Sequence, residues 1–171
     1  ENPNPRRATE LAGLAVAKRG VSVSVVRLPQ VHDINKQGLI TELIKIARQK
    51  GVSGYVEDGQ NRWSAVHISD VAEVYLRALE KNIPDSRYHA VAEEGIPLRS
   101  LAEVIGYALK VPVKRIAAKD AKEHFGWMSL LINHDMSASG TLTQERLAWK
   151  PVGPGMIEDL LMIHSASNNP T

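Results

Sequence analysis

The chain has 171 residues, a formal net charge of +2 at pH 7, and 43% apolar and 23% charged residues. These values are ordinary for one globular domain with a hydrophobic core. The absence of cysteine excludes disulfides, thiolate catalysis and cysteine metal ligands. Lys and Arg are dispersed, which argues against nucleic acid as a partner. No apolar run reaches the roughly 18 residues of a membrane helix. We therefore expect a cytoplasmic protein that does not bind membranes.

Hydrophobic periodicity predicts helices that alternate with strands. In chain order, the expected helices cover residues 7–19, 39–50, 71–80, 98–110, 119–126, 143–149 and 156–164. The two well-defined strands are expected at residues 21–28 and 87–92, and weaker ones at 54–56 and 111–116, with a polar loop at 30–37. This order predicts an α/β fold with a mainly parallel sheet. Two good strands are few for such a sheet, so the chain resembles part of a larger fold.

The segment from Gly59 to Ala72 brings Arg62, Trp63 and His67 together just before a helix start. In open α/β proteins, ligands bind at junctions of this kind. The fork of the Arg62 guanidinium suits bidentate contacts, and the Trp63 indole could stack on a ring or exclude water. The alternative is a surface arginine and a half-buried tryptophan. We expect His67 to be structural, and Asp70 or Ser69 to cap the helix that follows.

Four motifs in a fixed order resemble the C-terminal half of an extended or atypical short-chain dehydrogenase/reductase of the NAD-dependent epimerase/dehydratase type. They are Val-Arg-Leu-Pro at 26–29, Val-His-Ile-Ser-Asp-Val-Ala at 66–72, Tyr-His-Ala-Val at 88–91 and Leu-Ala-Trp-Lys-Pro at 147–151. The resemblance covers roughly residues 5–162. It implies the C-terminal portion of a Rossmann-type NAD(P)-binding domain, roughly residues 1–92, and a small mixed α/β substrate lobe, roughly 93–164. A polar tail follows at 165–171.

The resemblance also implies site residues. Pro29, Gln30, Val31 and His32 would lie beside the nicotinamide, and Asn61, Arg62 and Trp63 beside the substrate. For the first group, the alternative is a strand end followed by an irregular loop. His32 and Asp33 could also form a base with its orienting carboxylate, although a surface histidine next to an aspartate in a loop is more often incidental.

Two departures from the family pattern bear on activity. The sequence contains no Gly-rich dinucleotide loop. The positions of the family's catalytic Tyr and Lys correspond to Asn2 and Arg6, which cannot repeat that chemistry. We therefore expect NAD or NADP to bind only together with an N-terminal half. That half would be part of the same protein or of a partner chain, and a homodimer is a further expectation from the family.

The leading hypothesis is an NAD(P)-dependent oxidoreductase or epimerase-like enzyme that acts on a small carbonyl or alcohol substrate. In it, this chain supplies the substrate lobe and the nicotinamide wall. The alternative is a non-catalytic binding or regulatory module that retains the fold. An apolar stretch at residues 125–132 indicates a core helix, a substrate pocket or lid, or an oligomer contact. The six histidines are far apart in sequence, so we expect no metal site.

Overall fold

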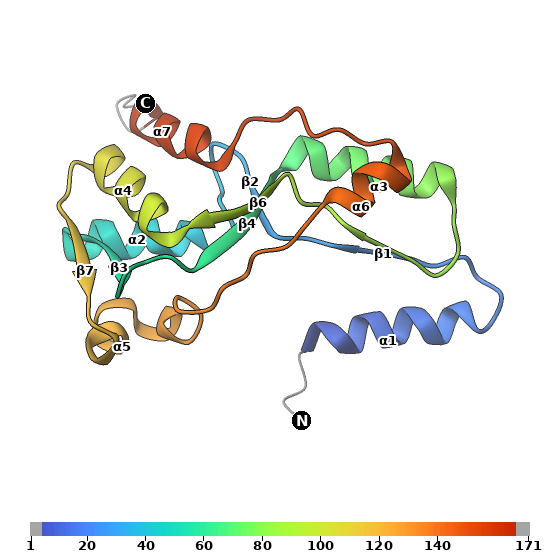
Figure 1. The fold of residues 1–171 in the computed structure, drawn as a ribbon, viewed down its shortest axis with the longest axis horizontal. Helices are drawn as coiled ribbons and strands as arrows, with labels where there is room; N and C mark the ends of the chain where they lie inside the picture. Colours follow the sequence, from blue (N-terminus) through green and yellow to red (C-terminus); the bar gives the residue numbers. More distant parts are fainter. Residues whose placement is uncertain (1–4, 167–171) are drawn as a thin grey trace.

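The computed structural model describes residues 5–166, which form an α/β fold (Figure 1). Helices and strands alternate along most of the chain. In order, the elements are α1 (Pro5–Ala17), β1 (Ser24–Arg27), β2 (Gln30–His32), α2 (Ile40–Lys50), β3 (Ser53–Val56), β4 (Arg62–His67), α3 (Ile68–Lys81), β5 (Ser86–His89), β6 (Glu93–Pro97), α4 (Leu98–Leu109), β7 (Val113–Ile116), the 3-10 turn η1 (Ala118–Asp120), α5 (Ala121–Phe125), the 3-10 turn η2 (Gly126–Leu130), α6 (Thr141–Leu147) and α7 (Met156–Ala166). Asn2 and residues 167–171 of the polar tail lie outside the described residues.

The strands pair mainly in parallel, which confirms the predicted α/β class. β1 pairs with β5, β2 with β4 and β3 with β7, all in parallel, while β4 and β6 are antiparallel. A helix lies in the connection between the partners of each parallel pair: α2 before β4, α3 before β5 and α4 before β7. Parallel pairing requires such long crossovers. The result is three small sheets, rather than the single sheet that the pattern predicts.

Two strands were not expected from local patterning. Gln30–His32, predicted as loop, forms β2, and Glu93–Pro97 forms β6. Both strands pair with β4, one on each side of it: Val31 lies opposite Val66, and Ile96 lies opposite Trp63. Each strand is therefore stabilised by a partner 28 or more positions away, and the local sequence carries little sign of it.

The apolar side chains divide between two cores. One core lies among α2, α4, α7 and β4, and includes Trp63, Phe125 and Met128. The other lies beneath α3 and α6 and includes Val74, Tyr88 and Trp149. These groups of helices occupy opposite ends of the molecule (Figure 1). Both cores use residues from either side of position 92, the expected boundary between the two parts of the chain.

The start of α3 differs from the predicted cap. The helix begins at Ile68, and the N-cap is His67, whose Nδ1 accepts a hydrogen bond from the backbone N–H of Ser69. Asp70 does not cap α3. Its carboxylate instead accepts from the backbone N–H groups of Val152, at 3.0 Å, and Gly153, at 2.9 Å. Asp70 therefore ties α3 to the segment before α7, a contact that the local cap pattern cannot reveal.

Candidate functional site

A cleft of about 780 Å³ opens at the carboxyl ends of β1 and β5. In parallel α/β sheets this end is where ligands bind, because loops diverge there and leave space. Residues from four parts of the chain line the cleft: Arg27, Leu28, Pro29, Gln30, Val31, Gly38, Leu39, Ser64, His89, Val91, Leu131, Met136 and Ala138. The link between β1 and β2 thus forms one wall, and the loop after η2 forms another.

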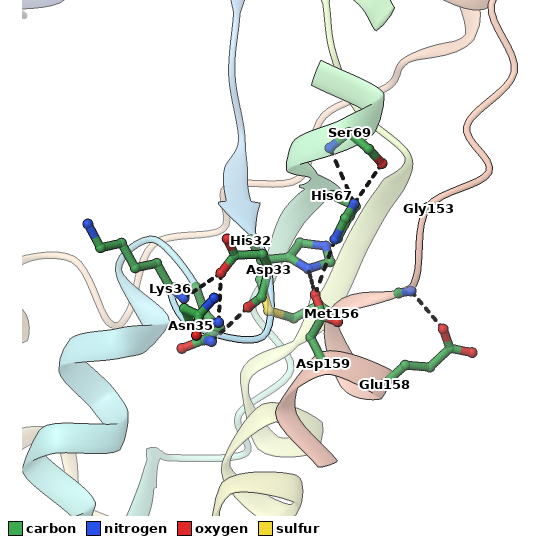
Figure 2. Close-up of polar contacts among 12 residues, drawn as sticks. His32, Asp33, Asn35, Lys36, His67, Ser69, Gly153, Met156, Glu158 and Asp159 are labelled. Atoms are coloured by element: carbon green, nitrogen blue, oxygen red, sulfur yellow. Dashed lines mark hydrogen bonds and ion pairs between the residues drawn. The ribbon is translucent and has the colours of Figure 1, made fainter. Parts of the chain in front are cut away.

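The four residues predicted to lie beside a nicotinamide divide between two locations. Pro29, Gln30 and Val31 line the cleft. His32 is the next residue of β2 and is buried, with 1% of its surface exposed. Its side chain points toward α7, as Figure 2 shows. Cofactor binding by the four residues stays a prediction, and the structure places three of them where a ligand has room.

Polar side chains of the cleft make hydrogen bonds to other parts of the protein. The Gln30 Oε1 accepts from the backbone N–H of Leu39 at 2.9 Å. The Arg27 guanidinium donates two hydrogen bonds of 2.8 Å to the two carboxylate oxygens of Glu10 on α1. This bidentate contact lowers the pKa of the Glu10 carboxyl. Ser64 donates to the backbone carbonyl of Met136 at 2.9 Å.

The residues predicted to contact substrate lie outside the lining of this cleft. Trp63 is fully buried and its Nε1 donates to the carbonyl of His134 at 3.0 Å. The Asn61 amide donates to the carbonyls of Ile132 and His134. Arg62 lies 3.5 Å from the carboxylate of Asp135. All three hold the segment at 132–135 against β4, and their binding of substrate stays a prediction.

Hydrogen bonds converge on Asp135 at this place. Its carboxylate accepts from the hydroxyl and the backbone N–H of Ser137 and from the backbone N–H of Arg62. These bonds, that of the Ser137 hydroxyl first, stabilise the charged form and lower the pKa of Asp135 to about 2. A lowered pKa in the folded state stabilises the protein above the unfolded pKa. This contribution disappears as pH falls toward about 2.

We expect Ser137→Ala to raise the pKa of Asp135 part of the way toward 3.8, since the two backbone donors remain. NMR titration of the side-chain carboxyl carbons measures this directly. Ser139→Ala is the control, because the Ser139 hydroxyl donates to Glu94 and not to Asp135. Equal effects of the two variants on Asp135 would contradict the assignment of the shift to the Ser137 hydroxyl.

Behind the cleft, a buried polar pair joins β2 to α7 (Figure 2). The His32 Nδ1 lies 2.7 Å from Asp159 Oδ2, and the two side chains are 0% and 3% exposed. An ionised carboxylate only accepts, so Nδ1 carries the hydrogen and donates it. The hypothesis that His32 pairs with Asp33 is wrong: Asp33 instead accepts from the backbone N–H groups of Asn35 and Lys36. These bonds lower the pKa of Asp33.

Two further groups approach the buried pair. The His67 ring packs edge-on against that of His32, with 5.6 Å between centroids. Glu93 Oε2 lies 3.8 Å from His32 Nε2 and accepts the backbone N–H of Met156 at 2.8 Å. Glu93 thus binds the first N–H of α7. Among the described residues, no group of three or more acidic or histidine side chains has an arrangement suited to a metal ion.

The apolar stretch at residues 125–132 separates into different roles. Phe125, Met128 and Ile132 are core residues. Leu131 lines the cleft, whereas Trp127 and Leu130 are 56% and 73% exposed. The core interpretation is therefore confirmed for Phe125, Met128 and Ile132, and a substrate contact by Leu131 stays a prediction.

Comparison with solved structures identifies the fold. A dTDP-glucose 4,6-dehydratase of Streptomyces venezuelae, with NAD and TYD bound, superposes with a TM-score of 0.67 at 18% identity, over 92% of this chain and 48% of that one. A UDP-glucose 4-epimerase of Thermus thermophilus, in complex with NAD, has a TM-score of 0.65 at 14% identity, over 94% and 52%. The chain has a Rossmann-like dehydratase/epimerase fold. It corresponds to about half of each of these structures.

Sequence comparison finds nearer relatives of undetermined function. An uncharacterized protein of Schizosaccharomyces pombe is 43% identical over 159 residues, which are 92% of this chain and 54% of that protein. One of Saccharomyces cerevisiae is 40% identical over 156 residues, 91% of this chain and 52% of that protein. The chain thus spans about half the length of the curated relatives it matches. No family model matches it.

Sequence reasoning missed several residues that the structure brings to these sites. His89, Leu131 and Met136 reach the cleft, and Asp159 reaches His32. His32 and Asp159 are 127 positions apart in sequence. The sequence offers one weak signal for this pair: each of the two residues is polar and lies in an apolar segment. Such residues could have many other partners, so the signal does not identify the pair.

Every helix among residues 5–166 is too short or too polar to cross a membrane.

Proposed function

We propose that this chain is the substrate lobe and nicotinamide wall of an NAD(P)-dependent oxidoreductase or epimerase-like enzyme that acts on a small carbonyl or alcohol. The observation that carries the proposal is the cleft at the carboxyl ends of β1 and β5. Its position matches the general location of ligands in parallel α/β folds. Structural neighbours of the same fold were crystallised with NAD, which supports the choice of cofactor.

The residues at the cleft suit one end of the cofactor. Pro29 and Val31 offer an apolar surface at a strand end, and Gln30 offers amide hydrogens. A nicotinamide, when bound, donates or accepts a hydride. Pro29 and Val31 would exclude water from its ring, and Gln30 would help to orient the reacting group. The pyrophosphate has no equivalent support, because the sequence contains no Gly-rich loop before a helix.

The unpaired edge of β1 supports the proposal that an N-terminal half of the enzyme packs against this chain. Among the described strands β1 pairs only with β5, so its second edge is unpaired. A second hollow of about 780 Å³ lies between β1 and α1, lined by residues such as Glu10, Val25 and Leu28. An unpaired edge in an α/β sheet is normally covered by a neighbouring strand or helix. In the proposed enzyme, the N-terminal half fills this position.

Calorimetric titration with NADH and NADPH tests the proposal. We expect the full-length gene product that contains this chain to bind one of them with micromolar affinity, and the 171-residue chain alone to bind neither at that level. We expect Val31→Arg to weaken binding by about tenfold or more, because the guanidinium would occupy the cleft. Val152→Arg is the control, since Val152 is 83% exposed and lies outside the cleft lining.

Two results would overturn the proposal: micromolar binding by the chain alone, or no dinucleotide binding by the full-length product. The second result would favour the non-catalytic module. The presence of Asn2 and Arg6 where the family has its catalytic Tyr and Lys also favours that alternative. Turnover of a carbonyl substrate with NADPH would exclude the non-catalytic module.

A further inference from the structure

We propose that the cleft selects an uncharged, largely apolar carbonyl or alcohol and excludes nucleotide-diphosphate sugars. This inference rests on the proposed function and specifies its substrate class. The cleft has a volume of about 780 Å³, which is within the usual range for a small-molecule site. The chemistry of its walls therefore decides which ligands it accepts.

The walls are mainly apolar on both sides. Leu28, Val31 and Leu39 come from the β1–β2 link and the start of α2. Leu131 and Met136 come from the loop after η2. An apolar ligand gains free energy from burial against such walls, whereas a charged ligand loses its hydration without replacement.

The cations near the cleft are already neutralised. Among the described residues, Arg27 is the one Lys or Arg that lines it, and both of its hydrogen bonds at 2.8 Å go to Glu10. Arg62 lies outside the lining and faces Asp135. A diphosphate carries at least two negative charges and requires unpaired cations or several backbone donors when it is buried. This half of the site supplies no such cation.

One neutral donor remains for a single oxygen. Because Gln30 Oε1 accepts from the Leu39 N–H, the Nε2 hydrogens of Gln30 have no partner within residues 5–166. The His89 Nε2 lies 3.4 Å from Arg27 Nη1, on the guanidinium that already binds Glu10. The amide hydrogens of Gln30 suit the oxygen of a ketone, an aldehyde or an alcohol. They do not compensate a diphosphate.

Ligand-observed NMR on the full-length gene product tests the substrate class without turnover. The probes are 4-phenyl-2-butanone, which is neutral and mainly apolar, and UDP-glucose. We expect saturable binding of the ketone and none of UDP-glucose at the same concentrations. We expect Leu131→Arg to weaken ketone binding by about tenfold or more, because it places an unpaired charge in the cleft. The adjacent Leu130→Arg should leave ketone binding unchanged, since Leu130 is 73% exposed and does not line the cleft.

A second variant keeps the test valid if Leu131→Arg fails to fold. Ala138 lines the cleft from a segment outside any helix or strand, and Ala138→Lys should weaken ketone binding in the same way. Tighter binding of UDP-glucose than of the ketone overturns the inference. Ketone binding that is absent, or insensitive to both Leu131→Arg and Ala138→Lys, also overturns it. NADH affinity of the same sample is measured separately: its absence overturns the proposed function, whereas tight UDP-glucose binding overturns only the substrate class.

Discussion

We expect Trp63→Ala to lower the free energy of unfolding by about 4 kcal/mol, as is usual when a large aromatic side chain is removed from a core. Trp63 has no exposed surface and belongs to the core among α2, α4 and α7. Its indole N–H also holds the carbonyl of His134. The variant therefore loses apolar burial and one of the two side-chain hydrogen bonds that the His134 carbonyl accepts.

Trp127→Ala is the matched control, because Trp127 is 56% exposed. We expect it to change stability by less than about 1 kcal/mol. Urea denaturation followed by far-UV circular dichroism measures both variants. If Trp63→Ala retained stability and lost only ligand binding, Trp63 would be a substrate contact and not a core residue.

Asp159→Ala should lower the free energy of unfolding by about 3 kcal/mol, because the loss of one partner leaves the other buried and unpaired. His32 is fully buried, and its Nδ1 hydrogen bond of 2.7 Å goes to Asp159. Water cannot easily replace the carboxylate at a site with so little exposure. The pair also joins β2, which forms part of the cleft wall, to the C-terminal helix.

Glu158→Ala is the control on the neighbouring residue of α7. Glu158 accepts the backbone N–H of Gly155 at 3.0 Å from an exposed position. We expect Glu158→Ala to lower the free energy of unfolding by about 1 kcal/mol or less, as for the loss of a helix cap. The double variant His32→Ala with Asp159→Ala completes a mutant cycle. A coupling energy near zero would show that the two side chains do not depend on each other.

The sequence alone identified most helices within a few residues. α2 was expected at residues 39–50 and covers Ile40–Lys50, with Gly51 as a left-handed C-cap. α4 was expected at 98–110 and covers Leu98–Leu109. Helical periodicity and terminal glycines are local properties, so a short window contains them in full. The α/β class followed from the alternation of these segments with strands.

Strands and site residues depended on distant partners. β2 and β6 exist because β4 lies between them, and neither has a strong pattern of its own. Asp70 was assigned a local capping role, yet its carboxylate binds backbone N–H groups shortly before α7. A short polar side chain has many local partners available, and only the folded chain selects among them.

The sequence by itself thus determined the helices and the fold class, and the family resemblance singled out three residues that line the cleft: Pro29, Gln30 and Val31. Tertiary structure decided the opposite wall, the neutralisation of Arg27 by Glu10, and the pairing of His32 with Asp159. The physical reason is the range of the interactions. Periodicity reports which face of an element is buried, whereas hydrogen bonds between elements depend on how those faces meet in space.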